Sequence, residues 1–134
     1  TIPAMDRPKI ENSRDAAEIF RMYWNQDHIE LLEEAYLMLV NRANRVLGII
    51  KLSQGGIAGT VIDPKLVFVA ALKAAASGLF LCHNHPSGNL IASQSDIALT
   101  RKIKEGAKLL ELTLMDHIII TKDSHVSMAE EGLL

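Results

Sequence analysis

The chain has 134 residues, a length typical of one domain, and 49% of them are apolar, which allows a hydrophobic core and excludes a disordered chain. Fourteen basic and sixteen acidic residues give a formal charge of −2, so the composition gives no electrostatic reason to expect tight binding of nucleic acid. The single cysteine, Cys82, excludes an internal disulfide framework and fits a reducing compartment. Without an apolar run of about 20 residues or a signal peptide, we expect a cytoplasmic protein with no membrane contact.

The first part of the chain predicts a helix followed by a β-hairpin. Residues 1–12 are polar and contain prolines, so we expect a loose leader. Ser13 is a good N-cap for a helix over Arg14–Trp24, where apolar residues recur at helical spacing. Ala35–Val40 is continuously apolar, as a strand buried on both faces would be, and Arg45–Leu52 returns after a turn as its partner strand.

The second part predicts an alternation of helices and strands. Asp63-Pro64 is a strong helix start, and the sequence Ser77-Gly78 is expected to end that helix. Its apolar face is predicted to consist of Val67, Phe68, Ala71, Ala74 and Ala75. A buried strand, a helix, a strand and a short final strand are expected over Leu79–Cys82, Asp96–Leu110, Leu112–Thr121 and Val126–Met128. This order indicates one α/β domain over residues 1–134, with helices flanking a mixed sheet.

The stretch Leu81–Asp96, which reads LCHNHPSGNLIASQSD, contains the residues that point to chemistry. Residues two apart on a strand share a face, so His83 and His85 can aim two imidazoles at one point. The following loop contains proline and glycine, which allow the chain to fold back and return Asp96 to that point. Two histidines and one carboxylate are a suitable ligand set for a catalytic zinc ion whose fourth position is left to water.

Several of these residues also have plain structural interpretations. Ser93 and Asp96 match the capping-box pattern of a helix start, and this role is compatible with a ligand role for Asp96. Cys82 precedes His83 and is therefore expected on the opposite face as a core thiol. The pair Asp116-His117 either orients the ligands or is a buried polar pair, and we favour the second interpretation.

The pattern H-x-H-P-x6-S-x2-D resembles the JAMM metalloprotease motif of MPN domains, and its positions are filled by His83, His85, Pro86, Ser93 and Asp96. The strings HNHPSG, SQSDIALT and MDHIII look like the RadC branch of that superfamily, over a range from about Ser13 to the end of the chain. The resemblance implies an MPN fold, related in architecture to cytidine deaminases. Deaminase chemistry itself is disfavoured, because the sequence has neither H-x-E nor P-C-x-x-C.

The sequence departs from the family pattern at two points. Ala92 stands where many RadC-like sequences have a proline, which affects the stiffness of the loop and not its chemistry. Full RadC proteins also carry an N-terminal helix-hairpin-helix segment, and this chain contains no sequence that resembles one.

The resemblance implies a zinc-dependent hydrolase of peptide or isopeptide bonds, with Zn²⁺ held by His83, His85 and Asp96, in a family associated with DNA repair. Its substrate would be a protein or peptide. The first rival function is a non-enzymatic binding module in DNA repair or replication, although the charge predicts weak or no nucleic-acid binding. A metal-dependent nuclease is a weaker rival, because the histidine-rich ligand set suits zinc better than Mg²⁺.

The family also implies two catalytic residues outside the ligand set. It places a proton-shuttling glutamate at the edge of the first strand, where Glu33 and Glu34 stand, and the register counted from Asn41 favours Glu33. The two side chains should face opposite ways, so only one of them can serve; the alternative is that both form a solvated strand end. Ser93 would donate its hydroxyl to the oxyanion that forms on the attacked carbonyl.

Overall fold

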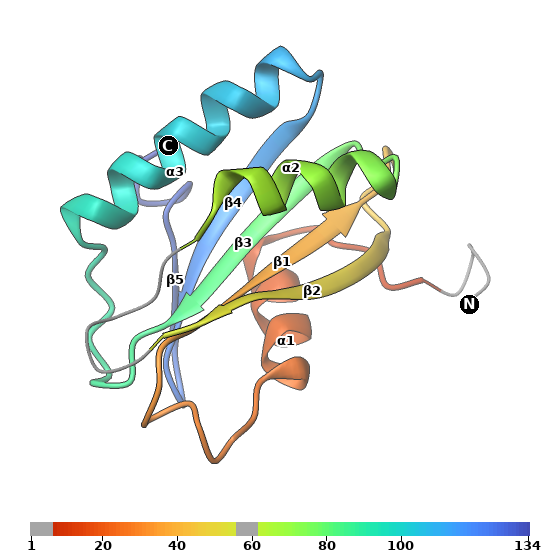
Figure 1. Ribbon diagram of the computed structural model, residues 1–134. Helices are drawn as coiled ribbons and strands as arrows, with labels where there is room; N and C mark the ends of the chain where they lie inside the picture. Colours follow the sequence, from red (N-terminus) through yellow and green to blue (C-terminus); the bar gives the residue numbers. More distant parts are fainter. Residues whose placement is uncertain (1–6, 56–61) are drawn as a thin grey trace.

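The computed structural model describes residues 7–55 and 62–134. Within these residues, three helices and five strands form an α/β fold with one mixed sheet, which confirms the predicted class (Figure 1). The elements are α1 (Ser13–Tyr23), β1 (Glu34–Val40), β2 (Val46–Gln54), α2 (Pro64–Lys73), β3 (Gly78–Asn84), α3 (Gln94–Leu109), β4 (Thr113–Ile120) and β5 (His125–Ser127). Every helix in the described ranges is too short or too polar to cross a lipid bilayer.

The sheet has the strand order β2-β1-β3-β4-β5, so β3 lies in the centre. Strand β1 runs antiparallel to both β2 and β3, whereas β3 and β4 run parallel and β5 closes the sheet antiparallel to β4. A parallel pair needs a crossover connection, and α3 provides it between β3 and β4. This topology sends the loop after β3 over the end of the sheet and returns it as the start of α3.

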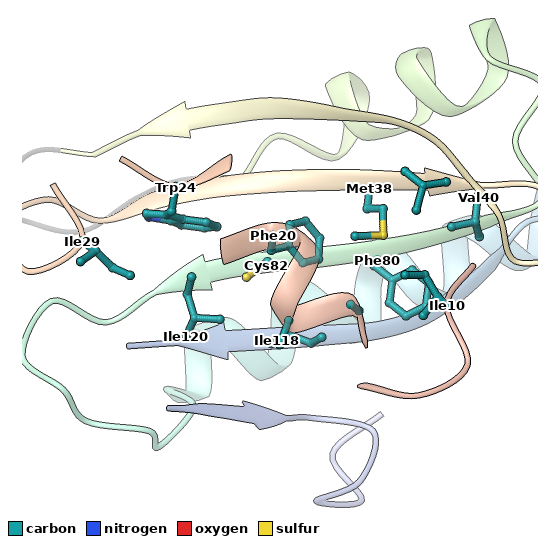
Figure 2. Packing of buried hydrophobic residues seen from close by; sticks show 13 residues of the cluster. Ile10, Phe20, Trp24, Ile29, Met38, Val40, Phe80, Cys82, Ile118 and Ile120 are labelled. Atoms are coloured by element: carbon teal, nitrogen blue, oxygen red, sulfur yellow. The ribbon is translucent and has the colours of Figure 1, made fainter. Parts of the chain in front are cut away.

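Two hydrophobic layers hold the helices on the sheet. Figure 1 shows α2 and α3 on one face and α1 on the other. On the α1 face, Phe20 and Trp24 pack against strand residues such as Met38 and Phe80 (Figure 2). Cys82 is buried in this layer, as predicted for a core thiol, and burial raises the pKa of its thiol well above the ordinary value. Because strand side chains alternate, the intervening residues of β1 and β3 pack under α2 and α3.

Helix α1 begins one residue earlier than the sequence predicts, and its N-cap is Asn12. The side-chain oxygen of Asn12 accepts a hydrogen bond of 2.9 Å from the amide of Asp15. Ser13 is the first helical residue, and its hydroxyl donates to the carboxylate of Glu130. The prediction of Ser13 as the cap is therefore wrong, because two adjacent residues of good capping type compete for one position.

Helix α2 begins as predicted, with Asp63 as N-cap and Pro64 at the first helical position, but it ends at Lys73. Ala75 adopts a left-handed conformation with φ of 50°, which turns the chain towards β3. Ala74 and Ala75 are consequently exposed and do not belong to the predicted apolar face.

The expected leader is only partly described, since residues 1–6 lie outside the described ranges. The described part is attached to the sheet and is not loose. Lys9 forms an isolated β-bridge with Arg45, and Ile10 is buried in the layer beneath α1. The apolar side chain of Ile10 explains this attachment, because its burial offsets the cost of ordering the segment.

We expect Asn12→Ala to lower the free energy of unfolding by about 1 kcal/mol, because the amide of Asp15 loses its acceptor. Ser13→Ala is the matched control and should cost less, since it loses only an exposed contact with Glu130. Urea denaturation of both variants measures the difference. A larger loss for Ser13→Ala would contradict the assignment of Asn12 as the cap.

Candidate metal centre

Two imidazoles meet where β3 ends. His83 is buried near the end of the strand, and the amide of His85 just beyond it donates to the carbonyl of Ile120 at 3.0 Å. The Nε2 atoms of the two histidines lie 3.0 Å apart, as their shared face predicts. The Nδ1 atom of His85 lies 2.6 Å from the carbonyl oxygen of Asn89. Because a carbonyl only accepts hydrogen bonds, this Nδ1 carries the proton and the Nε2 of His85 has a free lone pair.

Asp96 reaches the same point from the first turn of α3. Its Oδ2 atom lies 3.3 Å from Nε2 of His83 and 3.7 Å from Nε2 of His85. The predicted capping box is also present, since Oδ2 accepts from the Ser93 amide at 3.1 Å and the Ser93 hydroxyl accepts from the Asp96 amide at 3.0 Å. The helix cap therefore fixes the carboxylate that faces the imidazoles.

The charge of the Asp96 carboxylate and the charges of the two imidazoles depend on each other. Burial alone would raise the pKa of Asp96, but the attraction of its carboxylate to the imidazoles of His83 and His85 when these take up a second proton on Nε2 outweighs burial and holds this pKa well below the ordinary value. The hydrogen bond to Asp96 in turn raises the pKa of His85. The point where these side chains meet therefore stabilises positive charge, whether a proton or a metal ion supplies it.

The three facing atoms fit a tetrahedral metal ion. Bonds of about 2.0–2.1 Å at tetrahedral angles set neighbouring ligand atoms roughly 3.3 Å apart. The measured separations of 3.0, 3.3 and 3.7 Å between the two nitrogens and the carboxylate oxygen bracket this value. Two imidazoles and one carboxylate also leave a coordination position open, as catalytic zinc sites do.

Glu33 brings a second carboxylate to the two imidazoles. It lies just before β1, in which Ala35 pairs with His83, so two further residues of this register place Glu33 opposite His85. One carboxylate oxygen of Glu33 and one ring nitrogen of each histidine all lie within 4.8 Å of one another. Glu33, His83 and His85 are therefore a candidate metal-binding group, and Asp96 contacts the same two imidazoles.

Glu34 takes the opposite direction, as strand alternation predicts. Its side chain is 1% exposed, contacts the ammonium group of Lys51 and lies 3.8 Å from Nδ1 of His28. The hydrogen bond from Lys51 to Glu34 raises the pKa of this lysine. A solvated strand end is thus the wrong interpretation of Glu34, because its carboxylate is buried and paired.

Asn84, which stands between the two histidines, is a residue that the sequence analysis missed. It is fully buried, and its Nδ2 donates to the carbonyls of Ile29 and Leu32 at 2.8 Å each. Its Oδ1 accepts from the amide of Glu34 at 2.7 Å. These contacts tie the segment that carries Glu33 to the strand that carries the histidines. A single asparagine gives no sequence signal for such a role.

His117 of β4 lies against His83, and orienting the ligands is one of the two roles that the sequence left open for it. Its Nε2 atom is 2.7 Å from Nδ1 of His83, and its Nδ1 atom is 2.6 Å from the hydroxyl of Thr100 on α3. Burial lowers the pKa of His117 well below the ordinary value, so its imidazole is uncharged. His117 thus contacts a residue of the metal-binding group, so for this member of the pair the contact supports the less favoured of the two interpretations, that it orients a ligand.

Asp116, the neighbour of His117, has a separate role. Its carboxylate accepts from the hydroxyl of Ser127 at 2.5 Å and from the amide of Ala129 at 3.0 Å. Burial raises the pKa of Asp116 despite these hydrogen bonds. Asp116 therefore fixes the turn after β5, so the structural interpretation holds for this member of the pair.

Comparison with known proteins supports the family resemblance. A family model described as RadC-like JAB domain matches residues 10–133. The chain belongs to this family. A UPF0758 protein of Flavobacterium johnsoniae is 42% identical over 126 residues, which cover 93% of this chain and 53% of the relative. UPF0758 proteins of Porphyromonas gingivalis and Coprothermobacter proteolyticus are 35% and 34% identical over 99% and 97% of the chain.

The chain spans little more than half the length of these relatives, from 53% to 59%. The matched range contains the complete sheet and every residue of the candidate metal centre. The centre therefore belongs to the RadC-like domain itself.

We expect Asn84→Ala to lower the free energy of unfolding of the RadC-like domain by about 3 kcal/mol, because buried polar groups without partners cost roughly 1–3 kcal/mol each. The amides of residues 29–34 should also exchange faster with deuterium, since the segment loses its attachment to β3. Asn41→Ala is the control, because Asn41 accepts from two backbone amides in the turn at the other end of β1. If the Glu34 amide in Asn84→Ala exchanged as slowly as in the parent protein, the proposed attachment of this segment through Asn84 would be wrong.

Proposed function

We propose that the RadC-like domain is a zinc-dependent hydrolase of peptide or isopeptide bonds, with His83, His85 and Asp96 as the ligands. The main support for this proposal is that two imidazole nitrogens and one carboxylate oxygen lie 3.0 to 3.7 Å from one another. Zinc held by these three residues would supply Lewis-acid chemistry, which polarises a carbonyl and lowers the pKa of a coordinated water towards about 7. Histidine-rich ligand sets favour zinc over Mg²⁺, which argues for this ion.

Asp96 and Glu33 receive different roles in this proposal. Asp96 contacts both imidazoles at 3.3 and 3.7 Å and is fixed by the helix cap, as a ligand should be. One carboxylate oxygen of Glu33 lies within 4.8 Å of a ring nitrogen of each imidazole. Glu33 approaches them from the start of β1. From there Glu33 takes a proton from the attacking water and returns it to the leaving amine.

Ser93 is assigned the role of oxyanion donor. Its hydroxyl oxygen accepts a hydrogen bond from the Asp96 amide, so the hydroxyl group can still donate a hydrogen bond to a substrate oxygen. The side chain is exposed at the start of α3, where a substrate can reach it. The capping role and the catalytic role therefore use different parts of one hydroxyl group.

A peptide substrate is supported by a hollow of about 370 Å³ beside this loop. Ala92 and Gln94, the residues on either side of Ser93, contribute to its wall. The remaining wall is mostly apolar, with Ile97 and Val126 among its residues. We propose that it accepts an apolar side chain of the substrate next to the cleaved bond.

The proposed mechanism predicts that Glu33→Gln removes hydrolysis and retains zinc. The amide keeps the shape of the side chain and cannot take up the proton, so we expect a loss of roughly 10²–10⁴-fold in rate. Cleavage of a peptide library and elemental analysis of the purified protein measure the two properties.

Glu34→Gln is the matched control. It should retain turnover and zinc, with a lower melting temperature because Lys51 loses its partner. Loss of turnover in Glu34→Gln alone would place the shuttle one residue later. A parent protein that binds zinc without cleaving any library would instead support the non-enzymatic alternative.

A further inference from the structure

A chain of hydrogen bonds connects two of the proposed ligands behind the metal centre. Nδ1 of His83 lies 2.7 Å from Nε2 of His117, and Nδ1 of His117 lies 2.6 Å from the hydroxyl of Thr100. The same hydroxyl donates to the backbone carbonyl of Asp96 at 2.6 Å. These hydrogen bonds thus connect His83 on β3, through His117 on β4, to the first turn of α3, which carries Asp96.

The proton positions in this chain follow from its last acceptor. The carbonyl of Asp96 can only accept, so the Thr100 hydroxyl must donate to it and can accept at its own oxygen. Nδ1 of His117 therefore carries the proton that points to Thr100. A neutral imidazole has one N–H, so Nε2 of His117 is an acceptor and Nδ1 of His83 must donate to it. This leaves a lone pair on Nε2 of His83.

We propose that His117 and Thr100 are positioning residues that hold His83 in the tautomer able to bind the metal ion and connect its orientation to that of Asp96. The inference rests on the proposed metal function of this centre. It names the contacts that make metal binding by His83 possible, since an imidazole with a proton on Nε2 cannot bind a metal ion through that nitrogen.

Burial explains why water does not replace the hydrogen bonds between these side chains. His83, His117 and Thr100 are each at most 1% exposed, so bulk water does not compete for their polar atoms. Without the Thr100 hydroxyl, His117 can place its proton on Nε2 and donate to Nδ1 of His83. The proton of His83 then moves to Nε2, which faces His85 and Asp96. Thr100 therefore selects between two tautomer arrangements that are otherwise both possible.

The test compares Thr100→Val, which removes the hydroxyl at nearly constant shape, with Thr100→Ser, which retains it. Long-range proton–nitrogen NMR spectra of the metal-free protein report which nitrogen of His83 carries the proton. Titration of zinc against a competing chelator gives the affinity. We expect His83 to be protonated at Nδ1 in the parent and in Thr100→Ser. In Thr100→Val we expect mixed tautomers and a zinc affinity about 10–100-fold lower.

Ile103→Val controls for a general loss of stability. Ile103 lies on the same helix and is fully buried in the core beneath it. This variant should lower the melting temperature and leave the zinc affinity at the parental value. A merely structural role of Thr100 would give Thr100→Val the same behaviour and overturn the proposal.

The spectra also separate this proposal from the proposed function. A parent in which His83 carries its proton on Nε2 would overturn the positioning role whatever the zinc affinity. A parent with the expected tautomer that binds no zinc would refute the metal function and leave the tautomer assignment supported.

Discussion

The register between β1 and β3 is the constraint on which the candidate metal centre depends. Ala35 pairs with His83, and this pairing places Glu33 with the two imidazoles and directs Glu34 to the opposite face. A slip of one residue would exchange the two glutamates, because strand side chains alternate between faces. The side chain of Asn84 opposes such a slip, because it accepts from the amide of Glu34 and donates to the carbonyls of Ile29 and Leu32, and a shifted β1 would leave these buried groups without partners.

Rigid elements position each group of the centre. The capping box at the start of α3 fixes the Asp96 carboxylate, and Asn84 fixes the segment before β1. The parallel pairing of β3 and β4 sets His117 opposite Leu81, on the same face as His83, and the ring nitrogens of the two histidines lie 2.7 Å apart. Preorganisation of this kind lets a site bind its ligand without the cost of ordering side chains at the moment of binding.

The sequence predicted the parts of the centre that depend on local periodicity. The alternation of a strand brings His83 and His85 to one face, and the spacing of Ser93 and Asp96 specifies a capping box. The sequence contains no signal for the role of Asn84 and left two roles open for His117, because both roles depend on which strands become neighbours in the sheet and on contacts between segments 34 to 55 residues apart.

Some local features were also mispredicted, for physical reasons. Asn12 and Ser13 are adjacent residues with similar capping ability, so the sequence alone does not decide between them. The alanines after Lys73 have high helix propensity, but the left-handed Ala75 ends the helix because the chain must turn to enter β3. At the end of α2, the position of the next strand decided the outcome.

Anomalous diffraction at the zinc absorption edge, from a crystal of the protein grown with zinc, tests whether His83, His85 and Asp96 bind the ion. We expect one strong peak within roughly 2.0–2.2 Å of Nε2 of His83, Nε2 of His85 and an oxygen of Asp96. Glu33 should lie outside this ligand shell. A peak bound by Glu33 in place of Asp96, or a zinc ion held at a point without the two imidazoles, would contradict the account.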